Sequence, residues 1–415
     1  MKILLYSTNY YPEMTGIAKY NTEMAEWLVK KGHEVDVITA MPSYPEWEIY
    51  NDYQGKAIVT ENINGVNIFR TNLYVPSKKN ASAYRRLIMQ LTFTINTLRF
   101  WIPLYVGKKK YDIVFALCPP LIPLINAILY KWFKKVPIFL HVQDLEFDAA
   151  IRLGMIKSKF LLKILNKFEV YFINRADTVS SITNSMIDRI KEKRLKVTKF
   201  FLFPNWADTN FIKPLLKKNE FRNQIEKNSS KKIIMYSGNM GKKQGLEIIL
   251  EVADKFQRIT NQVEFVFVGD GVAKDDLQKI AIGKKIKNVT FFPIQPLETL
   301  PELLAAADVH LVIQKKEAAD LVMPSKLTNI LSAGRTVVAT AEPGTALYEA
   351  VMISKAGLVI EPENSEVLFN SIYELIKKES LNSFEQNARE YAEKYLDKEK
   401  ILYDFEAYLK SDKRC

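Results

Sequence analysis

A lysine stands near the start of an expected helix in the stretch DLVMPSKLTNILSAG, residues 320–334. Pro324 suits the first position of a helix, and Ser325 and Lys326 follow it. A cation is usually unfavourable there, because the N-terminal end of the helix dipole is already positive. The hydroxyl, the ammonium and the free backbone amides could together bind a diphosphate, and Asn329, one turn on, could hydrogen-bond ribose hydroxyls. This segment therefore predicts a phosphate-binding site.

Glycines follow three of the expected strands. Gly16 opens an expected helix after the first strand, and Gly238 begins a turn in SGNMGKKQG. Such a turn leaves N–H groups free for an anion, with Lys242 or Lys243 nearby. Gly269, in VGDG, could help to hold a nucleotide or simply allow the turn. These loops lack the G-x-G-x-x-G pattern of dinucleotide-binding folds, which argues against an NAD enzyme.

His141 and Asp144 end the expected strand VPIFLHVQD. Polar groups there are costly unless they are used or paired, and His141 could hydrogen-bond a leaving group or a sugar. Structural pairing of this histidine is the alternative. The three histidines and two cysteines are too scattered for a Cys/His metal cluster.

The elements that must position these residues alternate in two similar halves. Expected strands cover 2–8, 33–40, 112–118, 136–144 and 177–183, and then 231–238, 263–271, 289–296, 308–314 and 335–341. Strands that alternate with helices predict parallel βαβ units. The fold class is therefore α/β, with two Rossmann-like doubly wound parallel-sheet domains facing a cleft. Ligands of such sheets bind beyond the carboxyl ends of the strands.

The length of 415 residues suits two domains rather than one. We expect residues 1–208 to form an N-terminal, membrane-facing domain. Residues 209–383 would form the second domain. The final helical pattern, residues 384–415, would cross back toward the first domain.

The net charge of +12 belongs almost entirely to the first half. Lys and Arg outnumber Asp and Glu by 29 to 18 in residues 1–210, but only by 30 to 29 in residues 211–415. Basic clusters flank apolar, aromatic stretches at 87–106 and 121–133, which suits anionic lipid headgroups. Buried helices with solvated lysines are the alternative, and nucleic acid is disfavoured because no nucleic-acid motif accompanies the charge.

The termini and cysteines bear on location. The N-terminus lacks the pattern of a signal peptide, and no apolar run is long enough for a transmembrane helix. Two cysteines suggest no disulfide framework. We therefore expect a cytoplasmic protein, peripheral on the inner face of the cytoplasmic membrane.

Taken together, these segments resemble the GT4 family of retaining glycosyltransferases, which have the GT-B fold. The resemblance runs along nearly the whole chain and is strongest to the colanic acid biosynthesis fucosyltransferase group. It is carried by NYYPEMTGIAKY, GHEVDVITAMPSYP, LHVQDLEFDA, FLFPNWAD, YSGNMGKKQGLE and AADLVMPSKLTNIL. Transferases of N-acetylated deoxysugars in O-antigen assembly are also similar.

The resemblance implies that the first domain binds an acceptor and the second a nucleotide-diphospho-sugar. His141 matches the family's active-site histidine, and Gly16 matches its glycine loop facing the diphosphate. No metal or other cofactor is implied, because helix termini and basic residues neutralise the leaving diphosphate.

The departures from the family pattern lie in the second domain. The family's arginine and lysine fall on Asn239 and Gln244, and its two glutamates fall on Leu321 and Asn329. Asp320 or Glu317 could supply the lost sugar contact. Lys326 restores a cation on the opposite loop, and we expect it, with Lys243 as a second cation, to replace the missing basic pair.

The expected activity is metal-independent, retaining transfer of a sugar to a lipid-linked saccharide in exopolysaccharide, capsule or O-antigen assembly. Fucose from GDP-fucose is the leading donor. The alternatives are a UDP-N-acetyl sugar as donor, a nucleotide-sugar 2-epimerase, and an inactive scaffold. The base, sugar, acceptor and linkage stay open.

Overall fold

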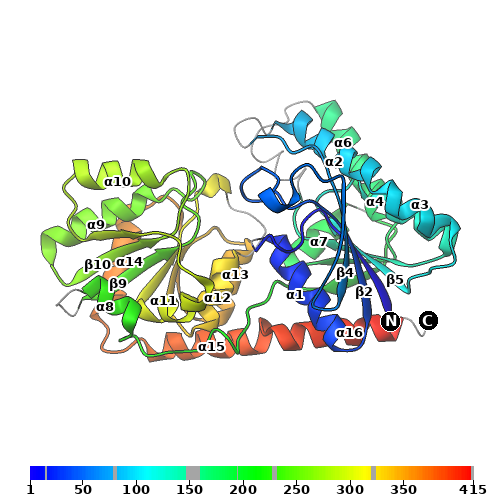
Figure 1. Ribbon diagram of the computed structural model, residues 1–415. Coiled ribbons are helices and arrows are strands. Elements are labelled where there is room, and N and C mark those ends of the chain that lie inside the picture. The colour runs from blue at the N-terminus through cyan, green and yellow to red at the C-terminus, as the bar shows by residue number, and fades with distance from the viewer. Residues whose placement is uncertain are drawn as a thin grey trace. The chain divides into compact units, whose positions relative to one another are not determined.

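The computed structural model describes residues 1–14, 16–77, 82–145, 159–193, 195–226, 231–318 and 324–412. Its internal contacts divide the chain into two units (Figure 1). Unit 1 contains Met1–Phe203 and the end of the chain from Asp404, and unit 2 contains Pro204–Tyr403.

Unit 1 is built on an eight-stranded sheet in the order β3-β4-β2-β1-β5-β6-β7-β8. The strands are β1 (Lys2–Tyr6), β2 (Glu34–Ala40), β3 (Ile58–Ile63), β4 (Val66–Thr71), β5 (Ile113–Cys118), β6 (Ile138–Val142), β7 (Thr178–Ser181) and β8 (Lys199–Leu202). All pairs are parallel except β3–β4. The helices are α1 (Ile17–Lys30), α2 (Ala83–Asn96), α3 (Leu98–Val106), α4 (Leu124–Lys134), α6 (Lys159–Ile173) and α7 (Asn184–Glu192). Strand order reverses between β1 and β5, so the loops after these two strands flank the switch point.

The β3–β4 hairpin is absent from the strands predicted above. It turns at Asn64 and Gly65, which both have positive φ. An Asn-Gly pair between two β-rich runs is a strong hairpin signal, because both residues tolerate this conformation. The sequence therefore contained the signal for this edge hairpin.

Unit 2 is built on a six-stranded parallel sheet in the order β11-β10-β9-β12-β13-β14. The strands are β9 (Lys232–Ser237), β10 (Val263–Val268), β11 (Val289–Phe292), β12 (Val309–Val312), β13 (Val337–Thr340) and β14 (Gly357–Ile360). The helices are α8 (Glu220–Glu226), α9 (Glu247–Ile259), α10 (Lys274–Gly283), α11 (Leu300–Ala306), α12 (Ser325–Ser332), α13 (Ala346–Ser354), α14 (Ser365–Lys377) and α15 (Asn382–Tyr395). This strand order is the Rossmann order, with its switch point between β9 and β12.

Alternate residues of β9 enter two different cores. Ile233 and Met235 belong to the apolar cluster on one face of the sheet, and Ile234 and Tyr236 belong to the cluster on the other. This is the two-residue alternation of a strand covered by helices on both faces. The predicted α/β class with doubly wound parallel sheets is confirmed.

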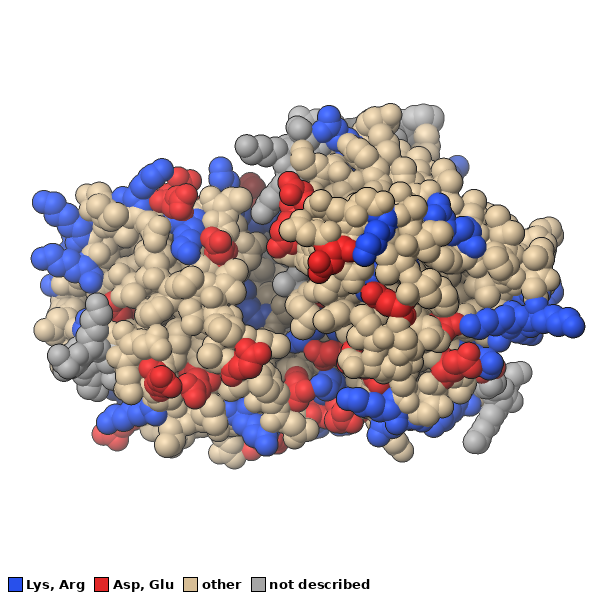
Figure 2. Space-filling view, in the orientation of Figure 1, with Lys and Arg blue, Asp and Glu red and all other residues tan. Residues whose placement is uncertain are grey.

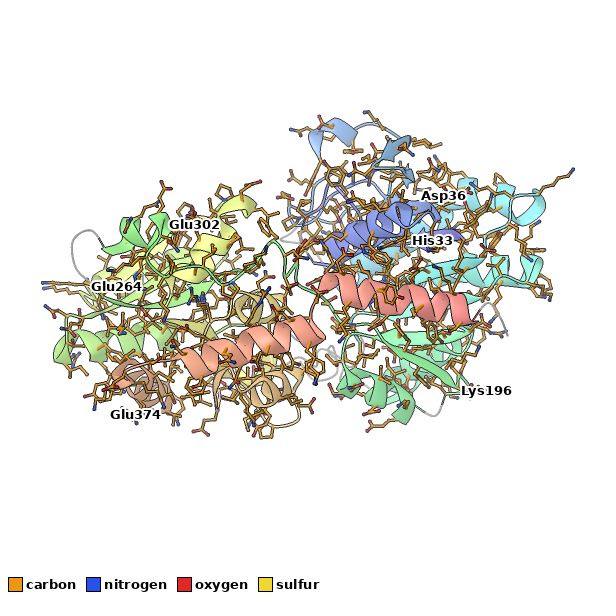
Figure 3. The ribbon with its side chains drawn as sticks, turned by 90° about the horizontal axis from the view of Figure 1, so that it is seen from below. His33, Asp36, Lys196, Glu264, Glu302 and Glu374 are labelled. Carbon is orange, nitrogen blue, oxygen red and sulfur yellow. The ribbon has the colours of Figure 1, made fainter. Side chains whose placement is uncertain are left out.

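The last helix, α16 (Lys398–Asp412), begins in unit 2 and ends in unit 1. In unit 1 the Phe405 ring stacks on Phe203 with their centroids 4.5 Å apart, and it meets Phe139 edge-on. Glu406 Oε1 lies 2.7 Å from Nε2 of the buried His33. Figure 3 labels His33. The end of the chain is therefore part of the unit 1 core.

Replacing Phe405 with alanine should lower the free energy of unfolding of unit 1 by about 3–5 kcal/mol, because the buried ring leaves a cavity. The exposed Tyr403 on the same helix provides the control, and Tyr403→Ala should change stability by about 0.5 kcal/mol or less. Urea unfolding followed by circular dichroism measures both. Equal losses from the two variants would contradict the assigned burial.

Candidate functional site

The loops that follow β9 and β10 are joined backbone to backbone. The amide of Gly238 donates to Val268 O at 2.9 Å, and that of Met240 donates to Asp270 O at 2.7 Å. A side chain on Gly269 would lie 2.2 Å from Gly238 O, so only glycine fits there. Close packing against Gly238 therefore requires a glycine at position 269. This packing holds the predicted phosphate-binding loop in place.

Helix α12 follows β12 at the other side of the switch point. Leu327, Ile330 and Leu331 are buried in the core of unit 2. Arg389 of α15 donates from Nη1 to Ser332 O at 2.8 Å at the C-terminal end of α12. The helix is therefore held along its length and at its end.

The N-terminus of α12 differs by one residue from the sequence prediction. Pro324 has φ −60° and ψ 127° and precedes the helix, which begins at Ser325. The prediction that Pro324 occupies the first helical position is wrong, because its ψ is extended rather than helical. The change moves Lys326 to the second position of the helix.

The side chain of Lys326 reaches the loop after β9. Its Nζ donates to Tyr236 Oη at 2.8 Å and lies 4.0 Å from the centroid of that ring. Tyr236 Oη in turn donates to Asn239 O at 2.7 Å. A side chain on Gly238 would begin 3.5 Å from the same Nζ. The structure therefore brings together three predicted residues, Lys326, Gly238 and Asn239, through a tyrosine that the sequence reading missed.

Burial lowers the pKa of the Lys326 ammonium to about 7. Within the described residues no carboxylate forms an ion pair with it. A half-buried ammonium without a counterion favours binding of an anion, because the anion offsets the cost of desolvating the cation. The nearby amides at the start of α12 favour an anion for the same reason.

The other predicted site residues of unit 2 differ in their exposure to solvent and in their hydrogen bonding. Lys243 is exposed, and its carbonyl accepts the amide of Lys315 at 3.2 Å. Gln244 Oε1 is buried and has no hydrogen-bond partner in the described chain, which leaves an acceptor for a ligand hydroxyl.

Ser325 is exposed at the helix start, and Asn329 is half-buried one turn later. Glu317 is exposed in the short helix Lys316–Ala318. Asp320 and Leu321 lie outside the described residues.

In unit 1 a buried glutamate that was not predicted holds the loop before Gly16. Glu13 Oε1 accepts the amides of Ser43 and Tyr44, both at 2.8 Å, and Oε2 accepts Asn9 Nδ2 at 2.8 Å. Burial raises the pKa of this carboxyl group. Glu13 is the only charged residue in positions 7–18, which is the signal that could have identified it.

Arg70 supports the same loop from β4. Its side chain is fully buried, pairs with Glu61 through Nε at 2.5 Å, and donates to Tyr11 O. Gly16 itself has φ 59°, and a side chain there would meet nothing within 4 Å. Glu13 and Arg70 therefore anchor a loop that leaves open space beside Gly16.

His141 is buried and paired through both ring nitrogens. Nδ1 lies 2.8 Å from Ser180 Oγ, and Nε2 lies 2.9 Å from Gln143 Nε2. Burial lowers its pKa to about 3, so the ring is neutral at physiological pH. A donating Gln143 amide requires the proton on Nδ1, which then donates to Ser180.

This is the pairing expected of a structural histidine, and the role of His141 toward a sugar stays a prediction. Asp144 is exposed two residues after the end of β6. Among the described residues no three His, Cys, Asp or Glu side chains gather to hold a metal ion.

Solved structures with the same fold define the class. Sucrose-phosphate synthase from Thermosynechococcus elongatus is 15% identical, with a TM-score of 0.75, and the match covers 99% of this chain and 98% of that one. Anabaena HepE in complex with UDP and glucose is 16% identical, with a TM-score of 0.69, and the match covers 99% and 100%. The fold is that of the GT-B glycosyltransferases, as predicted.

Sequence comparison places the chain in a family. Residues 15–206 match the glycosyl transferase 4-like domain, and residues 217–395 match glycosyl transferases group 1. The chain is 38% identical over 412 residues to WcaI of Escherichia coli (strain K12), a glycosyl transferase assigned by its name to colanic acid biosynthesis, with 98% of each chain covered. It is 22% identical to N-acetyl-alpha-D-glucosaminyl L-malate synthase of Bacillus anthracis over 413 residues, covering 95% of this chain and 94% of the other. The chain belongs to this GT4-like glycosyltransferase family.

Replacing Lys326 with methionine should weaken nucleoside diphosphate binding about tenfold or more, because a charge-assisted contact is lost. The melting temperature should stay equal or rise, because the half-buried amine no longer needs desolvation. Calorimetric titration and thermal unfolding test the two effects. Lys284→Met, at an exposed lysine of unit 2, is the matched control. Unchanged affinity in Lys326→Met would remove this residue from the site.

Binding of the same diphosphate should weaken as the pH rises above about 7. The unbound Lys326, with its pKa lowered to about 7, loses its proton in this range, and the anion must restore it. The dissociation constant should rise about tenfold per pH unit until the pKa of the bound lysine is reached. Titrations from about pH 7 to about pH 9 measure this slope. The slope should vanish in Lys326→Met, and a slope that persists there belongs to another group.

Proposed function

We propose that this glycosyltransferase moves a sugar from a nucleotide-diphospho-sugar, with GDP-fucose as the leading donor, to a lipid-linked saccharide in exopolysaccharide synthesis. The observation that carries the donor site is the half-buried Lys326 beside Gly238, at the switch point of unit 2. Negatively charged phosphates are the ligand class that this lysine and the start of α12 both favour.

The proposed role of this site is to stabilise the leaving diphosphate. Negative charge grows on the phosphate oxygen as the bond to the sugar breaks, and a fixed ammonium and aligned amides favour that charge most. Tyr236 fixes Lys326 before the donor arrives, so little reorganisation is needed during the reaction. The proposed transfer therefore needs no metal ion.

The contacts to the rest of the donor are proposed from the same surroundings. Asn329 and Ser325 would bind the ribose or a phosphate, and the unpaired Gln244 Oε1 would accept a sugar hydroxyl. Asp320 or Glu317 would replace the glutamate that this family places near the sugar. Retention would follow if the leaving phosphate oxygen takes the acceptor proton on the same face of the sugar.

In unit 1 we propose that Gly16 leaves room for substrate and that His141 and Asp144 serve the sugar side. A neutral His141 would act by hydrogen bonding and not as a cation. Its neighbour Gln143, in contact with Nε2, would transmit that hydrogen bond.

The choice of polysaccharide and sugar rests on relatives. WcaI, named for colanic acid biosynthesis, supports exopolysaccharide synthesis at 38% identity. The proposal that the transferred sugar is fucose rests on the resemblance of the sequence motifs to the fucosyltransferase group. A UDP-N-acetyl sugar is the second candidate, because the Bacillus anthracis relative is named for N-acetylglucosaminyl transfer.

The proposed acceptor carries a lipid diphosphate, which suits a basic first half with 29 Lys and Arg against 18 Asp and Glu in residues 1–210. No helix in the described ranges is long and apolar enough to span a bilayer. We therefore propose peripheral attachment to the inner face of the cytoplasmic membrane, with no nucleic acid partner.

Two rival functions differ in a measurable product. A nucleotide-sugar 2-epimerase would convert the donor without an acceptor, and an inactive scaffold would bind no donor. A glycosyltransferase releases free nucleotide when an acceptor is added. Nucleotide release that depends on a lipid-linked acceptor would therefore exclude both rivals.

A thermal-shift screen of nucleotide sugars should identify the donor. Specific binding raises the melting temperature by mass action, and the shift should be largest with GDP-fucose. UDP-N-acetylglucosamine is the main comparison, and the Lys326→Met variant should show a smaller shift with either nucleotide sugar. A larger shift with the UDP sugar would transfer the proposal to the second candidate.

A further inference from the structure

Helices α2 and α3 expose a continuous apolar stripe. Large apolar side chains recur at three- and four-residue spacing on α2 and again on α3, and all are exposed: Tyr84, Leu87, Leu91, Ile95, Ile102 and Val106. This spacing places the side chains of each helix on one face. We call these six residues the exposed stripe.

The opposite side of the same helices is also apolar. Phe93 and Trp101 are almost fully buried, and Leu104 is buried with them. Tyr6 of β1 contacts the rings of Phe93 and Trp101, with centroids 5.5 and 5.0 Å away. The inward-facing side chains of α2 and α3 therefore pack into the core of unit 1. The exposed stripe has no packing partner within the described part of unit 1. A helix that is apolar on both sides favours a second apolar neighbour.

Helix α4 extends this apolar surface. Its Trp132 and Phe133 are exposed, and the Phe133 ring lies 5.6 Å from that of Tyr105 on α3. Lys134 Nζ donates to Gly107 O at 2.6 Å and ties the end of α4 to the end of α3. The three helices lie together along the edge of unit 1 (Figure 1).

Almost all of the charged residues in this part of the chain are basic. Residues 62–143 contain twelve Lys or Arg and a single acidic residue, Asp112. Asp112 Oδ2 accepts the amide of Lys2 at 2.7 Å, while Lys108 and Lys110 are exposed just beyond the stripe. Among the coloured residues of Figure 2, tan and blue dominate over α2 and α3. Apolar side chains with a basic margin match an anionic bilayer surface.

We propose that the exposed stripe, with Trp132 and Phe133, is the face by which unit 1 docks on an anionic lipid bilayer. The inference deepens the proposed membrane location and rests on it. Apolar side chains would enter the boundary between headgroups and acyl chains, and Lys108 and Lys110 would contact the headgroups. Charge complementarity favours lipid over a second copy of this chain, because the basic margin would repel its own copy.

Co-sedimentation with vesicles tests the face. The full chain should bind phosphatidylglycerol-rich vesicles, bind phosphatidylcholine vesicles much more weakly, and lose binding at high salt. The double variant Ile95→Glu with Ile102→Glu should weaken binding about tenfold or more, because two apolar contacts become charged. The matched control is Ile282→Glu with Ile353→Glu on helices of unit 2. The exposed fractions are 61% and 53% in the test pair and 77% and 63% in the control pair.

Each outcome bears on a different claim. Weaker binding by the test pair alone, with unchanged melting temperature, supports the docking face. Equal binding by the test pair and the wild type overturns the face but leaves a membrane location. If the wild type binds no vesicle of either composition, both the docking face and the membrane location are overturned. If the wild type self-associates and the test pair abolishes this association, the face is instead a contact between two copies of the chain. The donor-induced thermal shift is independent of lipid, so it reports separately on the glycosyltransferase proposal.

Discussion

An ammonium without a counterion in the described residues is the constraint around which the second unit is organised. Lys326 is held by the hydroxyl and ring of Tyr236, and burial lowers its pKa to about 7. Such a group destabilises the unliganded protein and favours an anionic ligand. The parallel sheet makes the arrangement possible, because β9 and β12 bring the loop of Gly238 and helix α12 to the same switch point.

Close backbone packing gives this site its rigidity. Gly269 lies against Gly238, and a side chain on Gly271 would lie 2.5 Å from Met240 O, so the loops after β9 and β10 pack closely against each other. Arg389 and the buried side of α12 hold the helix that carries Lys326. In unit 1 the buried Glu13 and Arg70 hold the loop before Gly16 through hydrogen bonds to backbone groups. Both units thus place open loops on a fixed support.

Sequence reasoning recovered much of this arrangement but missed its supports. The alternation of β-rich runs and helical patterns predicted both sheets, and the glycine loops and Lys326 were singled out. The edge hairpin at Asn64 and Gly65 was overlooked despite its turn signal. Glu13 was overlooked although it is the only charged residue in positions 7–18. Tyr236 was not singled out because Lys326, which it holds, lies 90 positions away, and no local pattern specifies that contact.

The sequence by itself determined the strand and helix periods, the family motifs and the concentration of basic residues in the first half. These follow from local spacing and composition, which are written directly in the chain. Only the tertiary structure decided that Lys326 meets Tyr236, 90 positions earlier, and that His141 is paired on both nitrogens. It also decided which side of α2 and α3 is buried, since both sides are apolar in sequence. Burial and charge pairing depend on which elements the sheet brings together, and that is a property of the folded chain.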